Sequence, residues 1–290
     1  MDSFDRTPGV GRNVAPSGVK FRSRWARLGR SGVVVSAVVL VTGLGGIAHA
    51  GQAPAAVPLQ TPASSFGVEF TDCSELASIT TITVAKARSM VPASFTLVRD
   101  VGDVGGVPFV VRVAHCSAVS IDGSAADAAT VAQLGVSIAR PDGTGDINNY
   151  TAWYYTTSLR LALKLRLVGV PAQWVPRLGY DLVQNSANIG TLSVDMTAGH
   201  PAFRVTAPVV EPAAATIAFQ ANWWIQSGTH RTKMSTPIPG LRFGSATATL
   251  TTHRDGRLGR LLEGSTETFA LLDSFNRFDQ AHMTVAANTP

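Results

Sequence analysis

Residues 157–171 read Thr-Ser-Leu-Arg-Leu-Ala-Leu-Lys-Leu-Arg-Leu-Val-Gly-Val-Pro, and the interpretation of the whole chain depends on them. Leucine alternates strictly with other residues over 159–167, a pattern that ordinarily predicts a half-buried strand. Every residue of that run is nevertheless a good helix former, and none is β-branched. The Thr-Ser pair before it supplies an N-cap, and Gly169 followed by Pro171 is a standard helix end. We therefore predict a helix.

Most of the remaining sequence predicts strands, because segments rich in β-branched and aromatic residues alternate with turn residues. These segments are 79–84, 109–113, 134–138, 150–155, 191–196, 203–206, 216–225 and 243–253. A hairpin turn at Asp255-Gly256 predicts a further strand over 257–262, whereas the Ala- and Pro-rich stretch 207–215 predicts a loop. A second short helix is expected over 84–90. So many short strands predict an antiparallel barrel or sandwich.

The two helices and the strands between them follow a recognisable order. The short helix ends at Val91-Pro92, paired strands follow, and the longer helix runs into Gly-x-Pro at 169–171. Over roughly residues 78–262 this order resembles the acetoacetate decarboxylase-like superfamily. The resemblance implies a mainly β fold with a few helices (α+β), built as an antiparallel β-barrel or cone around a central cavity. In the decarboxylases Gly-x-Pro precedes two lysines; here Ala172 and Gln173 follow it.

The loss of those two lysines bears on the reaction. The resemblance implies that one lysine forms a Schiff base and that its neighbour lowers its pKa. Decarboxylation of a β-keto acid through an imine requires such an activated amine, which alanine and glutamine cannot supply. After residue 50 the chain offers only Lys86, Lys164 and Lys233, none beside another lysine. The sequence therefore predicts that the fold is kept and that this reaction is not.

The sequence contains no catalytic motif, and three charged residues are candidates for a catalytic role. Lys164 lies on the predicted helix between two arginines, whose charges would lower its pKa. A solvated lysine on the polar face of the helix is the alternative interpretation. Arg177 and Glu69 complete the set, as charged residues that a pocket could use.

The sequence predicts neither a metal site nor a cofactor. The histidines after residue 50 show no His-x-His or His-Glu-x-x-His spacing, and there is no Gly-x-Ser-x-Gly nucleophile elbow. Oxygen-bearing side chains over 142–148 are similar to a calcium loop, but Ile147 replaces the turn glycine and Trp153 the final glutamate. We interpret this segment as a turn before a strand.

Aromatic residues give the strongest indication of a ligand. Alternation places Trp153 and Tyr155 on one face of a predicted strand and Tyr154 on the other, while Trp223 lies on a second strand. In an open barrel, one such set would line the cavity. The residues predicted to bind a ligand are Trp153, Tyr155 and Trp223, with Gln173, Trp174 and Arg177 at the rim. Ordinary core packing is the alternative interpretation of the rings.

The first fifty residues have the pattern of a secretory signal peptide. A cationic segment, an apolar run from Val33 to Val41 and a closing Ala48-His-Ala50 predict cleavage before Gly51. An uncleaved membrane anchor is the alternative. We expect residues 51–66 to form a flexible Ala- and Pro-rich tether and residues 67–290 to form a single β-barrel domain.

Charge and cysteine content fit an exported protein. Seven of the 24 lysines and arginines, but two of the 19 acidic residues, lie in residues 1–50, so the remainder is formally neutral. Its charge therefore gives no indication of nucleic-acid binding. In an oxidising compartment the two cysteines, Cys73 and Cys116, predict one disulfide. Closing that loop would stabilise the fold by about 3–4 kcal/mol.

These observations lead to three functional hypotheses. The first is a secreted barrel that binds a small, partly apolar molecule in its central cavity and lacks the Schiff-base lysine. The second is an extracellular lyase or hydrolase of the same fold, and the third is a non-catalytic envelope protein tethered outside the membrane by its leader. A small molecule is the only expected partner, nucleic acid is not expected, and membrane contact arises only through an uncleaved leader. The sequence does not predict an oligomeric state.

Overall fold

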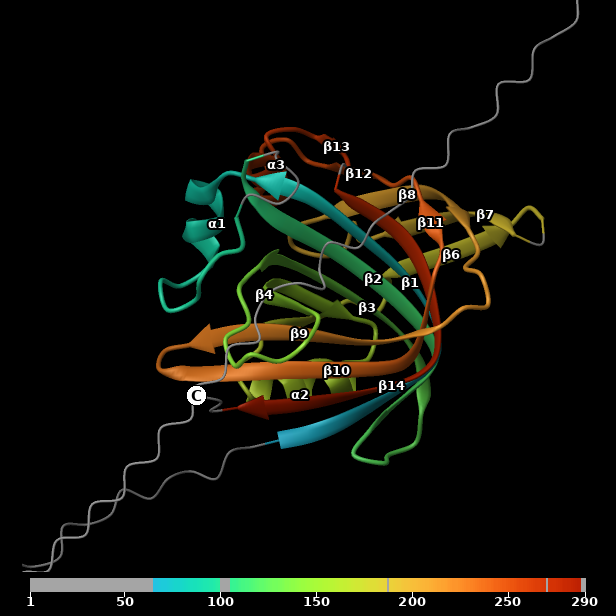
Figure 1. Ribbon diagram of the computed structural model, residues 1–290, viewed down its shortest axis with the longest axis horizontal. Coiled ribbons are helices and arrows are strands. Elements are labelled where there is room, and N and C mark those ends of the chain that lie inside the picture. Colours follow the sequence, from blue (N-terminus) through green and yellow to red (C-terminus); the bar gives the residue numbers. More distant parts are fainter. Residues whose placement is uncertain (1–64, 100–104, 187, 270, 288–290) are drawn as a thin grey trace, which may run out of the picture. The chain divides into compact units, whose positions relative to one another are not determined.

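Two β-sheets and three helices make up the part of the chain that the computed structural model describes, which is residues 65–99, 105–186, 188–269 and 271–287 (Figure 1). The predicted signal peptide and most of the predicted tether lie outside these residues. The tether was expected to reach residue 66, but the first strand already begins at Ser65. Among the described residues, no helix has the length and apolar character needed to cross a membrane.

The larger sheet closes into a barrel, as the sequence predicted. Its strands pair in the order β3-β2-β1-β14-β10-β9-β4, and an additional pairing of β4 with β3 completes the circle. The barrel strands are β1 (Ser65–Ile82), β2 (Val107–Ile121), β3 (Asp127–Ser137), β4 (Ile147–Thr156), β9 (Ile217–Ser227), β10 (His230–Phe243) and β14 (Leu272–Ala287).

One barrel pairing departs from the predicted antiparallel arrangement. β4 and β9 run parallel, whereas the other barrel pairs are antiparallel. The chain leaves β4, forms a helix and part of the second sheet, and returns to the barrel at β9. Such a long crossover permits parallel pairing, which a hairpin does not. β5 (Ala172–Trp174) also pairs parallel to β4 at the sheet edge.

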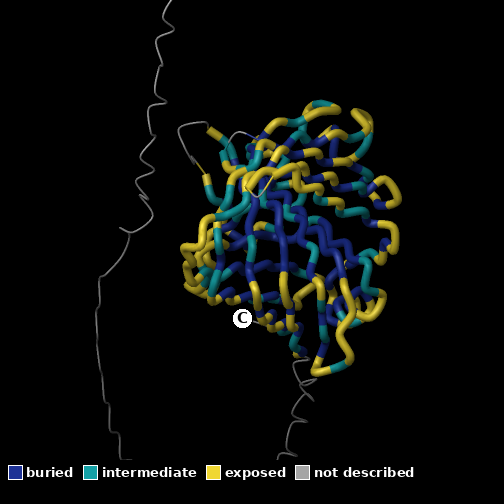
Figure 2. Tube along the Cα trace, turned by 90° about the vertical axis from the view of Figure 1, so that its right-hand side faces the viewer, coloured by how far each residue is buried: buried dark blue, intermediate teal, exposed yellow. Residues whose placement is uncertain are grey.

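The second sheet packs against the outer face of β1 to β4. Its members are β6 (Gly179–Gln184), β7 (Ile189–Asp195), β8 (Phe203–Val210), β12 (Thr249–Thr252) and β13 (Thr266–Thr268), with β11 (Ser245–Ala246) paired to β8. His115 of β2 stacks on Tyr180 of β6 with ring centroids 5.6 Å apart, and Tyr155 of β4 lies 6.4 Å from Phe203 of β8. Figure 2 accordingly shows buried residues along the middle of the strands and exposed ones in the peripheral turns.

Burial along β1 shows which side chains face the barrel interior. Phe66, Val68 and Phe70 are buried, and the residues between them are more exposed. At Asp72 the backbone has φ +48°, so the alternation changes phase and Glu75 then points inward. The residues that alternate with Glu75 face the second sheet. Both faces of the wall are therefore buried in this region.

Three helices accompany the sheets. α1 (Val84–Met90) and α2 (Leu159–Leu167) confirm the predicted helices. Ser158 caps α2, because its hydroxyl accepts from the Leu161 amide at 3.3 Å. α2 buries Leu161, Ala162 and Leu165, and its Lys164 lies 5.8 Å from the ring centroid of Phe66 at the start of β1, so it covers that end of the barrel.

α3 (Arg257–Leu262) corrects the strand predicted after Asp255-Gly256. Leu258 and Leu261 are both buried three residues apart, which is helical spacing that the short segment did not reveal. Two further predictions were wrong in part. β8 runs to Val210, inside the segment expected as a loop, and the strand expected over 243–253 is divided between β10, β11 and β12.

The predicted disulfide is confirmed. Cys73 of β1 and Cys116 of β2 are direct partners in the antiparallel register, with Cα atoms 4.1 Å apart, and their sulfurs are bonded. The bridge lies across neighbouring strands where the wall bends after Asp72.

Candidate functional site

A row of polar side chains crosses the inner face of five consecutive barrel strands. Asn276 of β14 lies opposite Glu75 of β1. On the next strands Arg112 of β2 lies opposite Gln133 of β3, and Gln133 lies opposite Tyr154 of β4. Polar residues are uncommon in such a position unless they are paired. We call these five residues the polar row.

Arg112 holds the row together. Its Nε and Nη2 both lie 2.6 Å from Oε2 of Glu75, and its Nη1 donates to Oε1 of Gln133 at 2.7 Å. The amide of Asn276 donates to the other carboxylate oxygen of Glu75 at 3.5 Å. The two charges therefore neutralise each other inside the wall. Burial raises the pKa of Tyr154 well above its ordinary value, so its hydroxyl stays protonated.

Five buried polar atoms on the inner face have no hydrogen-bond partner among the residues that the structure describes. They are Nε2 of Gln133, Nδ2 of Asn149, Oγ1 of Thr151, Nε1 of Trp223 and Oδ1 of Asn276. All five residues are at most 2% exposed. Leaving such a group unpaired costs about 1–3 kcal/mol, and most buried polar groups in proteins are paired. We call these atoms the unpaired set.

The unpaired set is contiguous along the wall. Asn149 of β4 lies beside Trp223 of β9 in the parallel register. Thr151, two residues further along β4, lies opposite Gly135 of β3, and Gln133 follows on the same face. The unpaired atoms thus extend from β9 across β4 to the polar row.

The hydrogen bonds within the polar row determine which of the unpaired atoms are donors and which are acceptors. Arg112 only donates, so the Gln133 oxygen must face it and the Gln133 amide nitrogen is the free donor. By the same argument, Asn276 donates to Glu75 and its oxygen remains a free acceptor. The indole nitrogen of Trp223 is a donor only. The interior therefore presents mainly N–H donors, which suit the carbonyl or hydroxyl oxygens of a guest molecule.

Trp223 of β9 reaches over β4 to β3 along the inner wall. A Cβ built on Gly135 would lie 2.7 Å from Cζ3 of the indole, and would also overlap the carbonyl oxygen of Tyr150. Only glycine leaves room for the ring at this position. The Trp223 ring and its free indole N–H therefore lie against β3 on the inner face.

The structure separates the aromatic residues that were predicted to line one cavity. Trp153 and Tyr155 face away from the interior. Trp153 packs edge-on against Phe109 at 6.4 Å, and the Tyr155 hydroxyl donates to the Pro201 carbonyl oxygen at 3.5 Å. Of the predicted rings Trp223 alone is on the inner face, and Tyr154 joins it. Alternation separated Tyr154 from its neighbours, but it could not show that the second sheet buries the outer face too.

The residues predicted at the rim lie at the barrel surface. Gln173 holds the backbone of His200 through two hydrogen bonds of 2.8 and 3.3 Å. Trp174 is 46% exposed and donates to the Thr157 carbonyl oxygen at 3.0 Å. Arg177 is exposed in the turn before β6. Gln173 and Trp174 therefore hold backbone segments next to β5 through hydrogen bonds.

Ala172 of β5 lies beside the polar row. It is the parallel register partner of Tyr154, so its side chain points to the same inner face, and it is 1% exposed. The three described lysines lie outside the barrel, each beside a carboxylate. Lys86 pairs with Glu263, Lys164 with Asp122 and Lys233 with Asp142, at 2.6, 3.0 and 2.5 Å.

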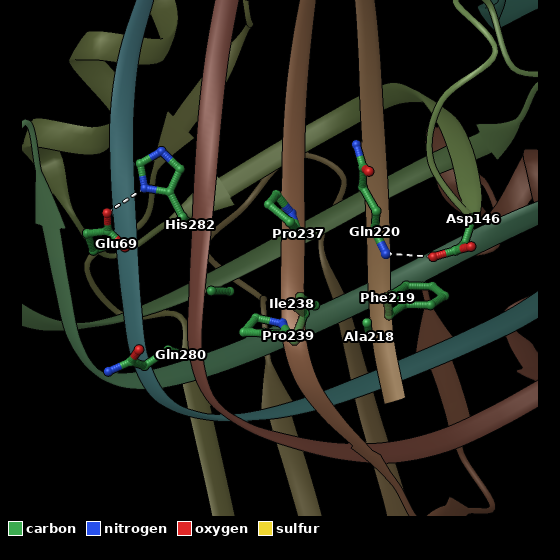
Figure 3. A pocket seen from close by; sticks show the side chains of 11 residues that line it. Glu69, Asp146, Ala218, Phe219, Gln220, Pro237, Ile238, Pro239, Gln280 and His282 are labelled. Carbon is green, nitrogen blue, oxygen red and sulfur yellow. Dashed lines mark hydrogen bonds and ion pairs between the residues drawn. The ribbon is translucent and has the colours of Figure 1, made fainter. Parts of the chain in front are cut away.

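The three candidate catalytic residues do not come together. Lys164 lies on α2 and Arg177 after β5, whereas Glu69 lies on the outer face of β1. Glu69 bonds Nδ1 of His282, its register partner on β14. This pair borders a surface groove of about 600 Å³ that spans β1, β14, β10 and β9 (Figure 3).

The turn that resembled a calcium loop is tied to the outer wall. Lys233 of β10 contacts Oδ2 of Asp142 and Oγ1 of Thr144, at 2.5 and 2.7 Å. The Asn222 amide donates to the carbonyl oxygen of Thr144 at 3.0 Å. These contacts occupy one carboxylate oxygen of Asp142 and both the hydroxyl and the carbonyl oxygen of Thr144. Over the described ranges, no group of three or more His, Cys, Asp or Glu side chains is placed to hold a metal ion.

Comparison with solved structures identifies the fold. Acetoacetate decarboxylase matches with a TM-score of 0.50 at 11% identity, over 76% of this chain and 87% of that one. An acetoacetate decarboxylase-like enzyme from Sphingomonas wittichii RW1 gives 0.48 at 12% identity, over 83% and 100%. MppR, an enduracididine biosynthesis enzyme, gives 0.44 at 8% identity, over 78% and 86%. No family model and no curated protein matches the sequence. The chain has the acetoacetate decarboxylase fold, which confirms the resemblance drawn from its element order.

Proposed function

We propose that this protein binds a small, partly apolar molecule inside its barrel without forming an imine. The observation that carries the proposal is the unpaired set, five buried polar atoms that share the inner face with the Trp223 ring. A guest whose oxygens accept from these donors would recover the hydrogen bonds that the fold leaves unmade. The charges of Arg112 and Glu75 cancel, so the site favours a guest without a full negative charge.

The absence of a Schiff-base lysine is part of this proposal. Ala172, the residue after Gly-x-Pro, is the register partner of Tyr154 and shares its inner face. Neither Ala172 nor Gln173 can form an imine, and the three described lysines lie outside the barrel in ion pairs. We infer a binding protein, or an enzyme whose chemistry needs no amine nucleophile.

We also propose that the protein is exported. The order of cationic, apolar and Ala-x-Ala segments in residues 1–50 supports export. The Cys73–Cys116 bridge supports an oxidising compartment. A mature mass that begins at Gly51 in the culture medium would establish both cleavage and release, whereas retention of residues 1–50 would establish the tethered alternative.

Indole NMR tests the binding proposal directly. In protein labelled with ¹⁵N-tryptophan, the Nε1–H resonance of Trp223 reports an unpaired inner donor. The Nε1–H resonance of Trp224 is the internal control, because this indole faces outward and already donates to Oδ1 of Asn148 at 2.9 Å. Titration with small neutral carbonyl compounds, from acetamide to cyclohexanone, should shift the Trp223 resonance saturably and leave that of Trp224 in place. Equal shifts at both indoles, or none at Trp223 across the series, would refute the interior site.

A further inference from the structure

The hydrogen-bond ladder between β10 and β14 is interrupted. Residues 232–235 of β10 pair with 284–287 of β14, and residues 242–243 pair with 276–277. Between these two ladders the strands share no register pair. The register is the same on both sides, so the strands separate and rejoin without an insertion. The barrel wall therefore has a gap at this place.

Two prolines explain the gap. Pro237 and Pro239 lack a backbone N–H, and alternate residues of a strand donate toward the same neighbour. On its other side β10 still pairs with β9 through Pro237 and Ile238. The missing donors therefore belong to the β14 side. Proline is confined to such unpaired strand sides in sheets.

The gap forms the floor of the surface groove. Pro237 and Pro239 of β10 lie on one side of it and His282 on the other (Figure 3). Ile238 and Ala281 face each other across it at matching register positions. They are 3% and 2% exposed, and both belong to the inner face. The groove is therefore separated from the barrel interior by these two apolar side chains.

The gap lies at the level of the unpaired set. On one side the last paired residue of β10 is Ser235, and its neighbour Met234 pairs with Trp223 of β9. On the other side the first paired residue is Arg242, and its neighbour Phe243 pairs with Asn276 of β14. The indole donor and the Asn276 acceptor therefore flank the part of the interior behind the gap. α2 covers one end of the barrel.

We propose that small molecules enter the barrel sideways between β10 and β14, and that Ile238 and Ala281 form the gate. This inference rests on the proposed function, since it supplies the interior site with an entrance. Glu69 and Asp146 border the groove, so its outer part carries acidic side chains. Neutral or cationic molecules are favoured there over anions.

Cysteine accessibility tests the entrance. The two native cysteines are bonded to each other, so Thr151→Cys introduces the only free thiol, near the Trp223 ring, at the cost of an unpaired hydroxyl. Its reaction with neutral methyl methanethiosulfonate is followed by intact mass in the folded protein. The anionic sulfonatoethyl reagent serves as the charge comparison. Each rate is measured alongside the free energy of unfolding in urea.

Gate variants should move the rate in opposite directions. Ala281→Leu fills the gap and should slow the neutral reagent by about tenfold or more, because packed interiors admit little. Ile238→Ala should speed it, and Ala118→Leu, an equal enlargement on β2, should leave it unchanged. The anionic reagent should react more slowly than the neutral one. Glu69→Gln with Asp146→Asn should reduce that difference.

Two results would overturn the entrance. One is a reaction rate of the Thr151→Cys thiol that is the same with Ala281→Leu, Ile238→Ala and Ala118→Leu. The other is a rate that follows the free energy of unfolding of each variant, because the thiol is then reached by unfolding. Either outcome leaves the proposed function intact if neutral carbonyl compounds still shift the Trp223 resonance. Conversely, a gated thiol reaction with no indole shift would keep the entrance and refute the carbonyl-binding site.

Discussion

Arg112 and Glu75 form an ion pair inside the barrel wall, with two guanidinium nitrogens 2.6 Å from one carboxylate oxygen. Their side chains are 16% and 8% exposed. Removing one partner of such a pair leaves an uncompensated charge, so Glu75→Gln should lower the free energy of unfolding by about 3–5 kcal/mol. Urea unfolding measures the change. Asp279→Asn removes the 80%-exposed partner of Arg242 and should cost less than about 1 kcal/mol. Equal losses in both variants would contradict the buried pair.

The Cys73–Cys116 bridge closes a loop with a sequence separation of 43. Removing it should lower the free energy of unfolding by roughly 4 kcal/mol, because the unfolded chain regains the entropy of the open loop. Cys73→Ala with Cys116→Ala, compared in urea with the oxidised protein, gives the value. The wild-type protein treated with a phosphine reductant should unfold at the midpoint of the double variant. A reduced protein as stable as the oxidised one would contradict the prediction.

Glu211 links acid stability to the junction between the sheets. Hydrogen bonds from Arg277 hold the pKa of Glu211 below its ordinary value of 4.5, with burial opposing them. A lowered carboxyl pKa contributes stability that is complete above the unfolded pKa and is lost as the pH falls through the folded value. The loss caused by Glu211→Gln should therefore be constant above about pH 5.5 and shrink toward acid. Urea unfolding from pH 7 to pH 3 measures it. If the loss of unfolding free energy caused by Glu211→Gln grew toward acid pH, the pKa of Glu211 would be raised in the folded protein and not lowered.

Gly135 keeps β3 clear of the Trp223 ring. Gly135→Ala places a methyl group against the carbonyl oxygen of Tyr150 and 2.7 Å from Cζ3 of the indole, so β3 or β4 and the ring must move. We expect a loss of about 1–3 kcal/mol, together with a changed Trp223 indole resonance. Gly240→Ala is the matched control, because the nearest atom to its added Cβ is a methyl group of Thr216 at 3.9 Å. Tolerance of alanine at 135 with an unchanged resonance would show that the ring does not lie against β3.

The sequence was sufficient for the barrel, the two longer helices and the disulfide because each has a local cause. Residues 159–167 combine helix propensity with a cap and a stop, and these outweighed their strand-like alternation. α3 was missed because a six-residue helix after Asp-Gly has the same local pattern as a hairpin. Local alternation likewise cannot foresee a parallel partner for β4, since the partner lies on the far side of a long crossover.

The candidate site was less accessible to sequence reasoning. The two sides of β4 carry similar aromatic residues, and both are buried, so the inner side could be assigned only once the second sheet was placed. Glu75, Arg112 and Gln133 are far apart in sequence and form no motif. Strand register alone brings them together. A charged or amide residue within an otherwise apolar strand, such as Arg112 in Val107–Ile121, was the one available signal.

Ala172 offers a test of how the interior relates to decarboxylase chemistry. Its Cβ points to the same face as Tyr154, so Ala172→Lys should place an amine among the inner-face residues. Burial lowers the pKa of such a lysine and makes it nucleophilic near neutral pH. The neutral ketone cyclohexanone, followed by borohydride, should then leave a covalent adduct on residue 172, visible by peptide mass spectrometry. Gln173→Lys, the adjacent residue on the opposite face, should give none. Adducts at both positions, or at neither in folded protein, would show that position 172 does not direct a side chain into the interior.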